Sequence, residues 1–178
     1  MTTIARNTAR ETRIRLACPA DAAAVCAIYT PYVRDTATTF DLEPPTLEEM
    51  EQKITTILEE RPFLVAEIER TDANTASTTS RVETCDDETF AVIGYSYASP
   101  FRPRKAYLHS IETSVYLAPE AKGFGLGTRL YNALEEILRL QNVYNANACV
   151  TCIEPADETC PSTSRIFHER RGYVQCAH

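Results

Sequence analysis

The segment from residue 113 to residue 140 constrains the fold more than any other part of this sequence. The chain has only five glycines, and three of them stand at positions 123, 125 and 127. The preceding Thr113–Leu117 segment is strand-like, and Thr128–Leu140 repeats apolar side chains at helical spacing. A strand, a glycine-rich turn and a helix in this order aim backbone N–H groups and a positive helix end at one point. The pattern favours a site for a phosphate-bearing ligand, although a loop that binds nothing is the alternative.

Two common phosphate-binding motifs do not fit this turn. A P-loop requires a lysine followed by serine or threonine directly after its last glycine, whereas Thr128 and Arg129 follow here. The dinucleotide fingerprint G-x-G-x-x-G is not met either, because the third glycine comes one residue early. The turn therefore requires another explanation.

Length and charge narrow the class of protein. The 178 residues suit one domain, and the formal net charge of −7 argues against a nucleic-acid partner. No apolar run approaches the roughly 20 residues that span a bilayer. Residues 1–12 lack the apolar region of a secretory signal, so we expect a flexible tail, with a short transit peptide as the alternative. We expect a cytoplasmic protein without a membrane or nucleic-acid partner.

Apolar periodicity predicts a mixed α/β domain over residues 13–178. Thr46 and Glu49 have the spacing of a capping box, which begins a helix that ends before Pro62. The polar 71–88 segment is too poor in large apolar groups to order itself, so we expect a mobile hairpin loop there. The other expected elements are strands at 13–17, 63–68, 90–98 and 111–117 and helices at 19–29 and 128–140.

The seven cysteines are expected to be mostly reduced thiols. Their number is odd and no secretory signal implies an oxidising compartment. Cys149 and Cys152 lie in the apolar run NACVTCI, which is typical of a buried strand that would send them to opposite faces. We therefore expect structural thiols and no metal site, with metal or redox chemistry as the alternative.

The glycine turn and several other stretches carry a resemblance to a known family. Residues 122–128, KGFGLGT, resemble the [QR]-x-x-G-x-[GA] signature of the GNAT acetyltransferase superfamily, and within it the chain resembles phosphinothricin N-acetyltransferases. The resemblance implies a GNAT fold, in which helices flank a central, mostly antiparallel, V-shaped sheet. It also implies acetyl-CoA as co-substrate and a possible homodimer. The other matching stretches are TF at 39–40, PTLEEM at 45–50, FLVAE at 63–67, GYSYA at 94–98, FRPRKAY at 101–107, ETSVYL at 112–117 and SRIFHERRGY at 164–173.

The resemblance also suggests roles for individual residues. Glu112 occupies the position of a base that takes a proton from the amine, with a structural carboxylate as the alternative. His168 is a candidate acid for the departing thiolate, although it could equally cap or pack its helix. The expected acetyl-CoA contacts are the backbone of Val115, Tyr116 and Leu117 and the turn residues Lys122, Gly123, Phe124, Gly125, Leu126, Gly127 and Thr128.

The expected substrate is a small amino-acid-like amine of the phosphinothricin or methionine sulfoximine type. Arg102 and Arg104 suit the capture of a carboxylate or phosphinate, with an ordinary solvated charge cluster as the alternative. Tyr107 and Phe40 are further candidates for substrate binding. Tyr32 is a candidate for the same pocket, and core packing is the alternative for both Phe40 and Tyr32.

Three departures from the family pattern leave other functions open. Lys122 replaces the usual arginine or glutamine, and Pro161 replaces an expected asparagine. The sequence ends six residues after Gly172, so we expect the sheet to lack its final C-terminal strand or strands. A catalytically silent CoA-binding module is therefore the alternative to the enzyme, and acetylation of a protein or peptide is a third possibility.

Overall fold

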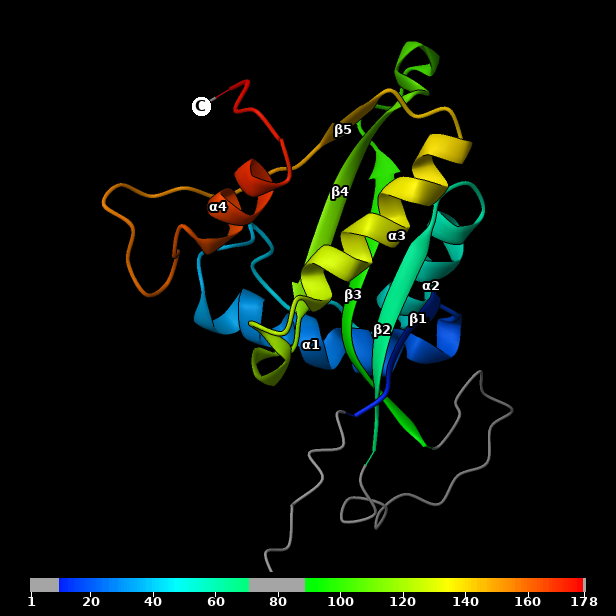
Figure 1. The fold of residues 1–178 in the computed structure, drawn as a ribbon, viewed down its shortest axis with the longest axis vertical. Helices are drawn as coiled ribbons and strands as arrows, with labels where there is room; N and C mark the ends of the chain where they lie inside the picture. Colours follow the sequence, from blue (N-terminus) through cyan, green and yellow to red (C-terminus); the bar gives the residue numbers. More distant parts are fainter. Residues whose placement is uncertain (1–9, 71–88, 178) are drawn as a thin grey trace, which may run out of the picture.

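The computed structural model describes residues 10–70 and 89–177. The expected 71–88 loop and most of the expected N-terminal tail lie outside these residues. The described chain forms a five-stranded sheet in the order β1-β2-β3-β4-β5 (Figure 1). The strands are β1 (Thr12–Leu16), β2 (Phe63–Glu69), β3 (Phe90–Pro100), β4 (Ser110–Leu117) and β5 (Asn145–Asn147).

The sheet is antiparallel except at one edge. Each of the first four strands pairs with its neighbour in antiparallel register, while β5 runs parallel to β4. The first four expected strands are confirmed to within two residues at each end. The register of β2 on β3 shifts between Ala66 and Glu67, which marks a β-bulge in this pair.

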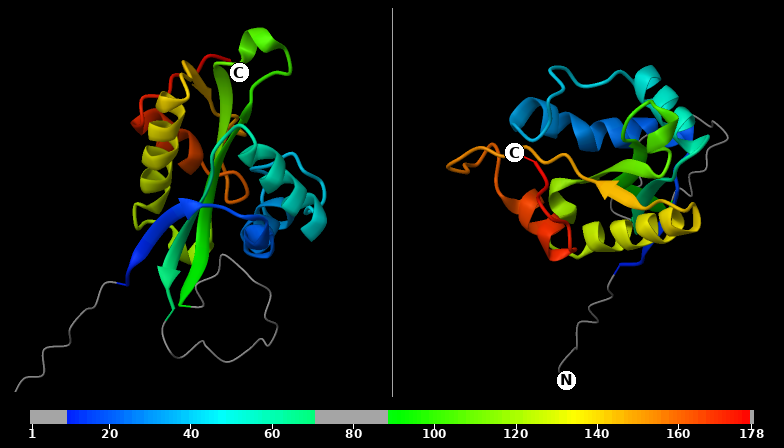
Figure 2. Two further views of the ribbon diagram at one scale, coloured as in Figure 1. Left: turned by 90° about the vertical axis from the view of Figure 1, so that its right-hand side faces the viewer. Right: turned by 90° about the horizontal axis from the view of Figure 1, so that it is seen from above.

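Helices cover both faces of the sheet, as Figure 2 shows in its edge-on view. One face is covered by α1 (Ala22–Asp35) and α2 (Leu47–Leu58), and the other by α3 (Leu126–Leu140) and α4 (Thr163–Arg170). Single turns of 3₁₀ helix complete the elements: η1 (Pro19–Asp21), η3 (Lys105–Tyr107) and η4 (Pro119–Ala121). Within the described ranges, no helix combines the length and the apolar character needed to cross a bilayer.

Each helical layer has its own apolar core against the sheet. The first core joins α1 and α2 to side chains such as Phe63 and Tyr95, and the second joins α3 to Leu64 and Ile111. Neighbouring strand residues such as Phe63 and Leu64 point to opposite faces, so one strand supplies both cores. The predicted capping box of α2 is confirmed, since Glu49 N–H donates to Thr46 Oγ1 and the Glu49 carboxylate accepts from Thr46 N–H.

Two expectations about the elements were wrong. The helix expected to end near Tyr29 continues through Pro31 to Asp35, because its last turns pack Tyr32 and Val33 against the first core. The expected buried strand around Cys149 and Cys152 is absent. β5 ends at Asn147, and both cysteines are exposed. Beyond Asn147 the chain no longer pairs with β4, so no ladder extends this strand. No strand follows α4 in the described part of the chain.

Candidate active site

The sheet opens along one edge of β4. β5 pairs with β4 only from Ser110 to Glu112, and no strand pairs with the same edge from Thr113 to Leu117 within residues 10–70 and 89–177. This divergence gives the V shape expected for the sheet. It leaves a row of backbone groups on β4 available to a ligand.

Strand alternation identifies the backbone groups that face this open edge. Ala118 N–H donates to Ile93 O on β3, so the polar groups of Ala118 point away from the opening. Because successive residues of a strand alternate, those of Val115 and Leu117 point into it. These are two of the residues whose backbone is expected to contact acetyl-CoA. Tyr116 instead places its ring beside Tyr29 and Tyr95 in the first core.

The glycine turn lies between this open edge and the N-terminus of α3. Gly123 and Gly125 have φ values of 86° and 73°, and a Cβ at either position would meet nothing within 4 Å. Glycine is therefore required at these two positions by the backbone conformation and not by lack of space, because only glycine adopts this left-handed region without strain. Gly127 is helical, and its Cβ would meet Phe167 at an ordinary 3.5 Å.

The beginning of α3 fits a phosphate group. The first bond of this helix runs from Arg129 N–H to Gly125 O, so the amides of residues 126–128 precede the helical ladder. Gly125 provides no side-chain cap, and Lys122 adds an exposed cation beside the turn. Free amides, a positive helix end and a lysine are the groups that bind a pyrophosphate. Of the expected turn contacts, Phe124 and Thr128 are exposed while Leu126 is buried in the first core.

Glu112, Cys149 and Arg102 come together where β5 leaves β4. Glu112 is half-buried and pairs in register with Asn147 at the end of β5. Burial and then the negative charge of Glu112 raise the pKa of the Cys149 thiol, while the positive charge of Arg102 lowers it. Cys149 was expected to be a buried structural thiol and is instead an exposed neighbour of the candidate base. This position depends on the opening of the sheet, which no sequence signal near Cys149 reveals.

A chain of hydrogen bonds links the first open residue of β4 to His168. The Tyr131 hydroxyl lies 3.1 Å from Thr113 Oγ1 and 2.8 Å from His168 Nε2. His168 Nδ1 lies 2.8 Å from Ser164 O, which can only accept, so the neutral tautomer carries its proton on Nδ1. Tyr173 approaches Thr113 Oγ1 at 3.4 Å. The sequence offered no sign of Tyr131 or Thr113, because only folding brings β4, α3 and α4 together.

Burial has the largest effect on the pKa values of the titratable side chains in this hydrogen-bond chain. Thr113, Tyr131 and His168 have exposed fractions of 3%, 0% and 7%. Burial lowers the pKa of His168 and the Arg171 charge lowers it further, while the hydrogen bond to Ser164 opposes both. Burial likewise raises the pKa of Tyr131. At neutral pH His168 is therefore a neutral, hydrogen-bonded imidazole.

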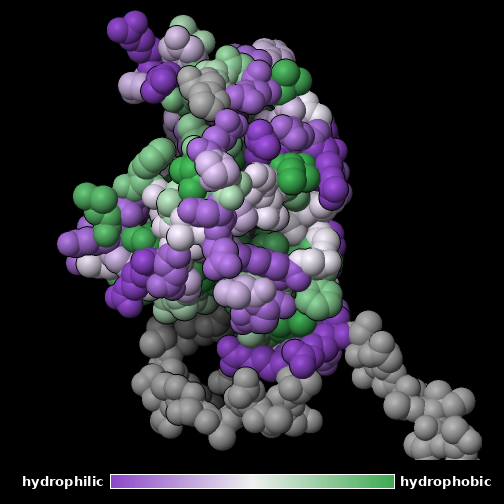
Figure 3. All heavy atoms as spheres, turned by 90° about the vertical axis from the view of Figure 1, so that its left-hand side faces the viewer, coloured by the Kyte–Doolittle hydropathy of each residue, from purple (hydrophilic) through white to green (hydrophobic). Residues whose placement is uncertain are grey.

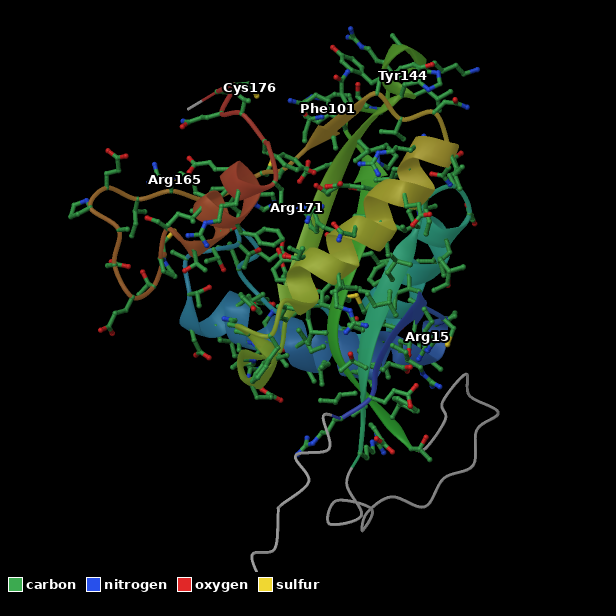
Figure 4. The ribbon with its side chains drawn as sticks, in the orientation of Figure 1. Arg15, Phe101, Tyr144, Arg165, Arg171 and Cys176 are labelled. Atoms are coloured by element: carbon green, nitrogen blue, oxygen red, sulfur yellow. The ribbon has the colours of Figure 1, made fainter. Side chains whose placement is uncertain are left out.

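The other candidate substrate residues lie at two separate places. Arg104 precedes η3, where the Tyr107 ring meets Phe101 edge-on at 6.1 Å. Phe101 directly follows β3 and lies at the same end of the sheet as Tyr144 (Figure 4). Phe40 belongs to the loop after α1 and is 86% exposed. Its role in substrate binding stays a prediction.

The face that carries α4 and the 148–162 loop shows hydrophilic side chains interspersed with small hydrophobic patches (Figure 3). A cavity of about 390 Å³ lies between this loop and the beginning of α4. Arg165 lies on α4, while Arg171 lies between α3 and α4 (Figure 4). Among the described residues, no group of three or more His, Cys, Asp or Glu side chains could hold a metal ion.

A model of the acetyltransferase (GNAT) family matches residues 40–160. The chain belongs to the GNAT family. It is 34% identical over 163 residues to the phosphinothricin N-acetyltransferase of Streptomyces coelicolor, covering 92% of this chain and 82% of the relative. The expected family, the GNAT fold and the acetyl-CoA-dependent N-acetyltransferase activity are thereby confirmed.

Solved GNAT structures are also similar to this chain. A phosphinothricin acetyltransferase from Sinorhizobium meliloti in complex with acetyl-CoA is 30% identical, with a TM-score of 0.71 over 92% of this chain and 76% of that one. A ribosomal-protein-alanine N-acetyltransferase from Brucella melitensis is 28% identical, with a TM-score of 0.71 over 93% of this chain and 86% of that one. The two neighbours are named for different acceptors, so this chain's acceptor is a separate question.

Proposed function

We propose that this GNAT enzyme acetylates the primary amine of a small amino-acid-like molecule of the phosphinothricin or methionine sulfoximine type. The observation that carries the proposal is the position of Glu112, at the point where the open edge of β4 begins. A carboxylate there lies next to the backbone groups proposed to hold the thioester. The amine and the acetyl group would meet at this point.

The chemistry follows from what an ammonium group must lose before it can attack. Glu112 takes one proton from the ammonium group, directly or through a water molecule, and leaves a nucleophilic amine. The amine attacks the thioester carbon while the Val115 N–H, the nearer of the two to Glu112 along the strand, stabilises the developing negative oxygen. The Leu117 N–H, two residues further along β4, remains for the pantetheine arm. The new C–N bond forms, the nitrogen releases its second proton to solvent, the C–S bond breaks, and the CoA thiolate leaves.

The departing thiolate takes up a proton, and His168 is the proposed source. Its path to the open edge runs through the Tyr131 hydroxyl, which contacts Thr113 on β4. Because the pKa of His168 is lowered and its proton is held on Nδ1 by Ser164 O, Nε2 must first take up a proton from solvent. The imidazolium formed in this way then passes a proton through the Tyr131 hydroxyl toward the thiolate and returns to the neutral form. Replacing His168 by glutamine should therefore slow turnover without changing the amine preference.

Two observations support an anionic amino-acid-like acceptor. The charges of Arg102 and Glu112 both shift the pKa of the Cys149 thiol, so the Arg102 guanidinium lies close to the proposed base. Such a group binds carboxylate and phosphinate oxygens in pairs. In addition, the Streptomyces and Sinorhizobium relatives are named for phosphinothricin.

Thiol release from acetyl-CoA tests the acceptor directly. The purified chain is incubated with phosphinothricin, methionine sulfoximine, a panel of simple amines and a peptide with a free N-terminal alanine. We expect release only with amine present, and fastest with the two amino-acid analogues. Fastest release with the peptide would replace the proposed acceptor by a protein N-terminus. Binding of acetyl-CoA without any release would favour the silent CoA-binding module.

Replacing Glu112 by glutamine tests the base. Glu112→Gln should lower kcat by about 10²- to 10⁴-fold, because it removes the proton acceptor while keeping the side-chain shape. The Kd for acetyl-CoA, measured by calorimetry, should stay within about twofold. Glu136→Gln makes the same charge change on the exposed side of α3 and should leave kcat unaltered. Equal rates for both variants would remove Glu112 from the mechanism.

A further inference from the structure

Tyr32 lies in the last part of α1 and touches both halves of the proposed acetyl-CoA site. Its hydroxyl donates a 2.7 Å hydrogen bond to Leu117 O, at the end of β4. Its ring lies 4.9 Å from Nζ of Lys122, beside the glycine turn. In Figure 1, α1 passes next to the turn that leads from β4 into α3. One side chain therefore contacts the strand end and the cation of the turn.

The hydrogen bond changes what the end of β4 offers to a ligand. Strand alternation places both N–H and C=O of Leu117 on the open edge. A bare carbonyl there would repel the oxygen atoms of a thioester, an amide or a pyrophosphate. Because Tyr32 donates to this carbonyl, its lone pairs are partly occupied, and the N–H group remains as the dominant polar group at this position.

The ring contact acts on the other half of the site. A cation over an aromatic face is attracted by the negative face of the ring. Lys122 is exposed and its side chain is long, so a contact at its tip restricts where its charge lies. The Tyr32 ring thus biases this charge toward the beginning of α3.

We infer that Tyr32 is a positioning residue for acetyl-CoA, through Leu117 O at the strand end and Lys122 Nζ at the turn. This inference rests on the proposed function, in which acetyl-CoA lies along the open edge of β4 with its pyrophosphate at the turn. It differs from the role in the substrate pocket expected for Tyr32 from the sequence. The contacts of Tyr32 lead to the cofactor side of the site rather than to Glu112.

Tyr29 supplies a matched control in the same aromatic cluster. Both tyrosines meet the Tyr116 ring edge-on, at 4.9 Å for Tyr29 and 5.1 Å for Tyr32. The Tyr29 hydroxyl bonds to Thr39 and Asp41 at 2.6 Å each, away from the open edge. Loss of either hydroxyl removes hydrogen bonding within the cluster, but only loss of the Tyr32 hydroxyl alters Leu117.

The experiment compares Tyr32→Phe with Tyr29→Phe. Acetyl-CoA binding is measured by calorimetry, and the Michaelis constants for acetyl-CoA and amine are measured at saturation of the other substrate. Tyr32→Phe should weaken acetyl-CoA binding about fivefold, equivalent to about 1 kcal/mol for one hydrogen bond. Its KM for the amine and its kcat should stay within about twofold. Tyr29→Phe should leave acetyl-CoA binding within about twofold of wild type.

A second substitution separates the two contacts. Tyr32→Leu removes the ring as well as the hydroxyl, so it should weaken acetyl-CoA binding further than Tyr32→Phe, provided its melting curve shows a folded protein. Unchanged acetyl-CoA binding in Tyr32→Phe, or equal weakening in Tyr29→Phe, would overturn the inference while the proposed function stands. Failure of the wild-type protein to bind acetyl-CoA would overturn both together.

Discussion

At the scale of single residues, the glycine turn depends on conformation rather than on space. Gly125→Ala should lower the free energy of unfolding by about 1–2 kcal/mol, because alanine resists the left-handed φ of 73°. It should also weaken acetyl-CoA binding, since the amides at the start of α3 would be redirected. Urea unfolding and calorimetry measure the two effects.

Gly127→Ala is the control for this substitution. Gly127 is helical, and its Cβ would meet Phe167 at 3.5 Å, so the added methyl group is tolerated. Alanine also has a higher helix propensity than glycine by about 1 kcal/mol. The free energy of unfolding should therefore stay the same or rise. A loss of stability as large as that of Gly125→Ala would contradict the conformational argument.

At the scale of secondary-structure elements, β1 is held to the sheet by an ion-pair cluster. Glu67 is 2% exposed and accepts hydrogen bonds from Arg13 and Arg15, and Arg15 also pairs with Asp21, the last residue of η1. Figure 4 labels Arg15. Glu67→Gln should lower the free energy of unfolding by about 2 kcal/mol, because it removes a buried counter-charge from two partly buried guanidinium groups, of which Arg15 keeps Asp21 as a partner.

The matched variant is Glu69→Gln, two residues later on β2 and exposed. Its free energy of unfolding, measured in urea at pH 7, should stay within about 0.5 kcal/mol of wild type. Both folded variants should bind acetyl-CoA as the wild type does, because the ion-pair cluster does not belong to the proposed site. Equal stability of the two variants would mean that the pairing of β1 does not depend on these charges.

At the scale of the whole molecule, His168 links folding stability to pH. Its pKa is lowered in the folded state, so below the unfolded value of about 6.5 the unfolded chain binds the proton more readily. The contribution of His168 is therefore present above about pH 6.5 and is lost as the pH falls toward its folded pKa.

Urea unfolding at pH 7.5 and pH 5.5 checks this dependence. Wild type and His109→Gln should lose stability on acidification by similar amounts, because His109 is exposed. His168→Gln should lose less stability on acidification, since glutamine places no titratable group beside the Tyr131 hydroxyl. An equal loss in all three proteins would show that other groups cause the acid sensitivity.

The sequence by itself determined most of the elements and the location of the glycine turn. Apolar periodicity, the capping box of Thr46 and the glycines between Leu117 and Thr128 are local signals, and they survive in the fold because tertiary packing agrees with them. The resemblance to the GNAT family extended these signals to acetyl-CoA and to the N-acetyltransferase activity.

Only the tertiary structure decided which side chains meet around the site. The divergence of β5 from β4 ends a strand that the apolar run around Cys149 predicted, and it places this cysteine beside Glu112. Continuation of α1 past Pro31 brings Tyr32 to Leu117 over 85 residues of sequence. Such contacts depend on how separate elements pack, and no local pattern encodes that packing.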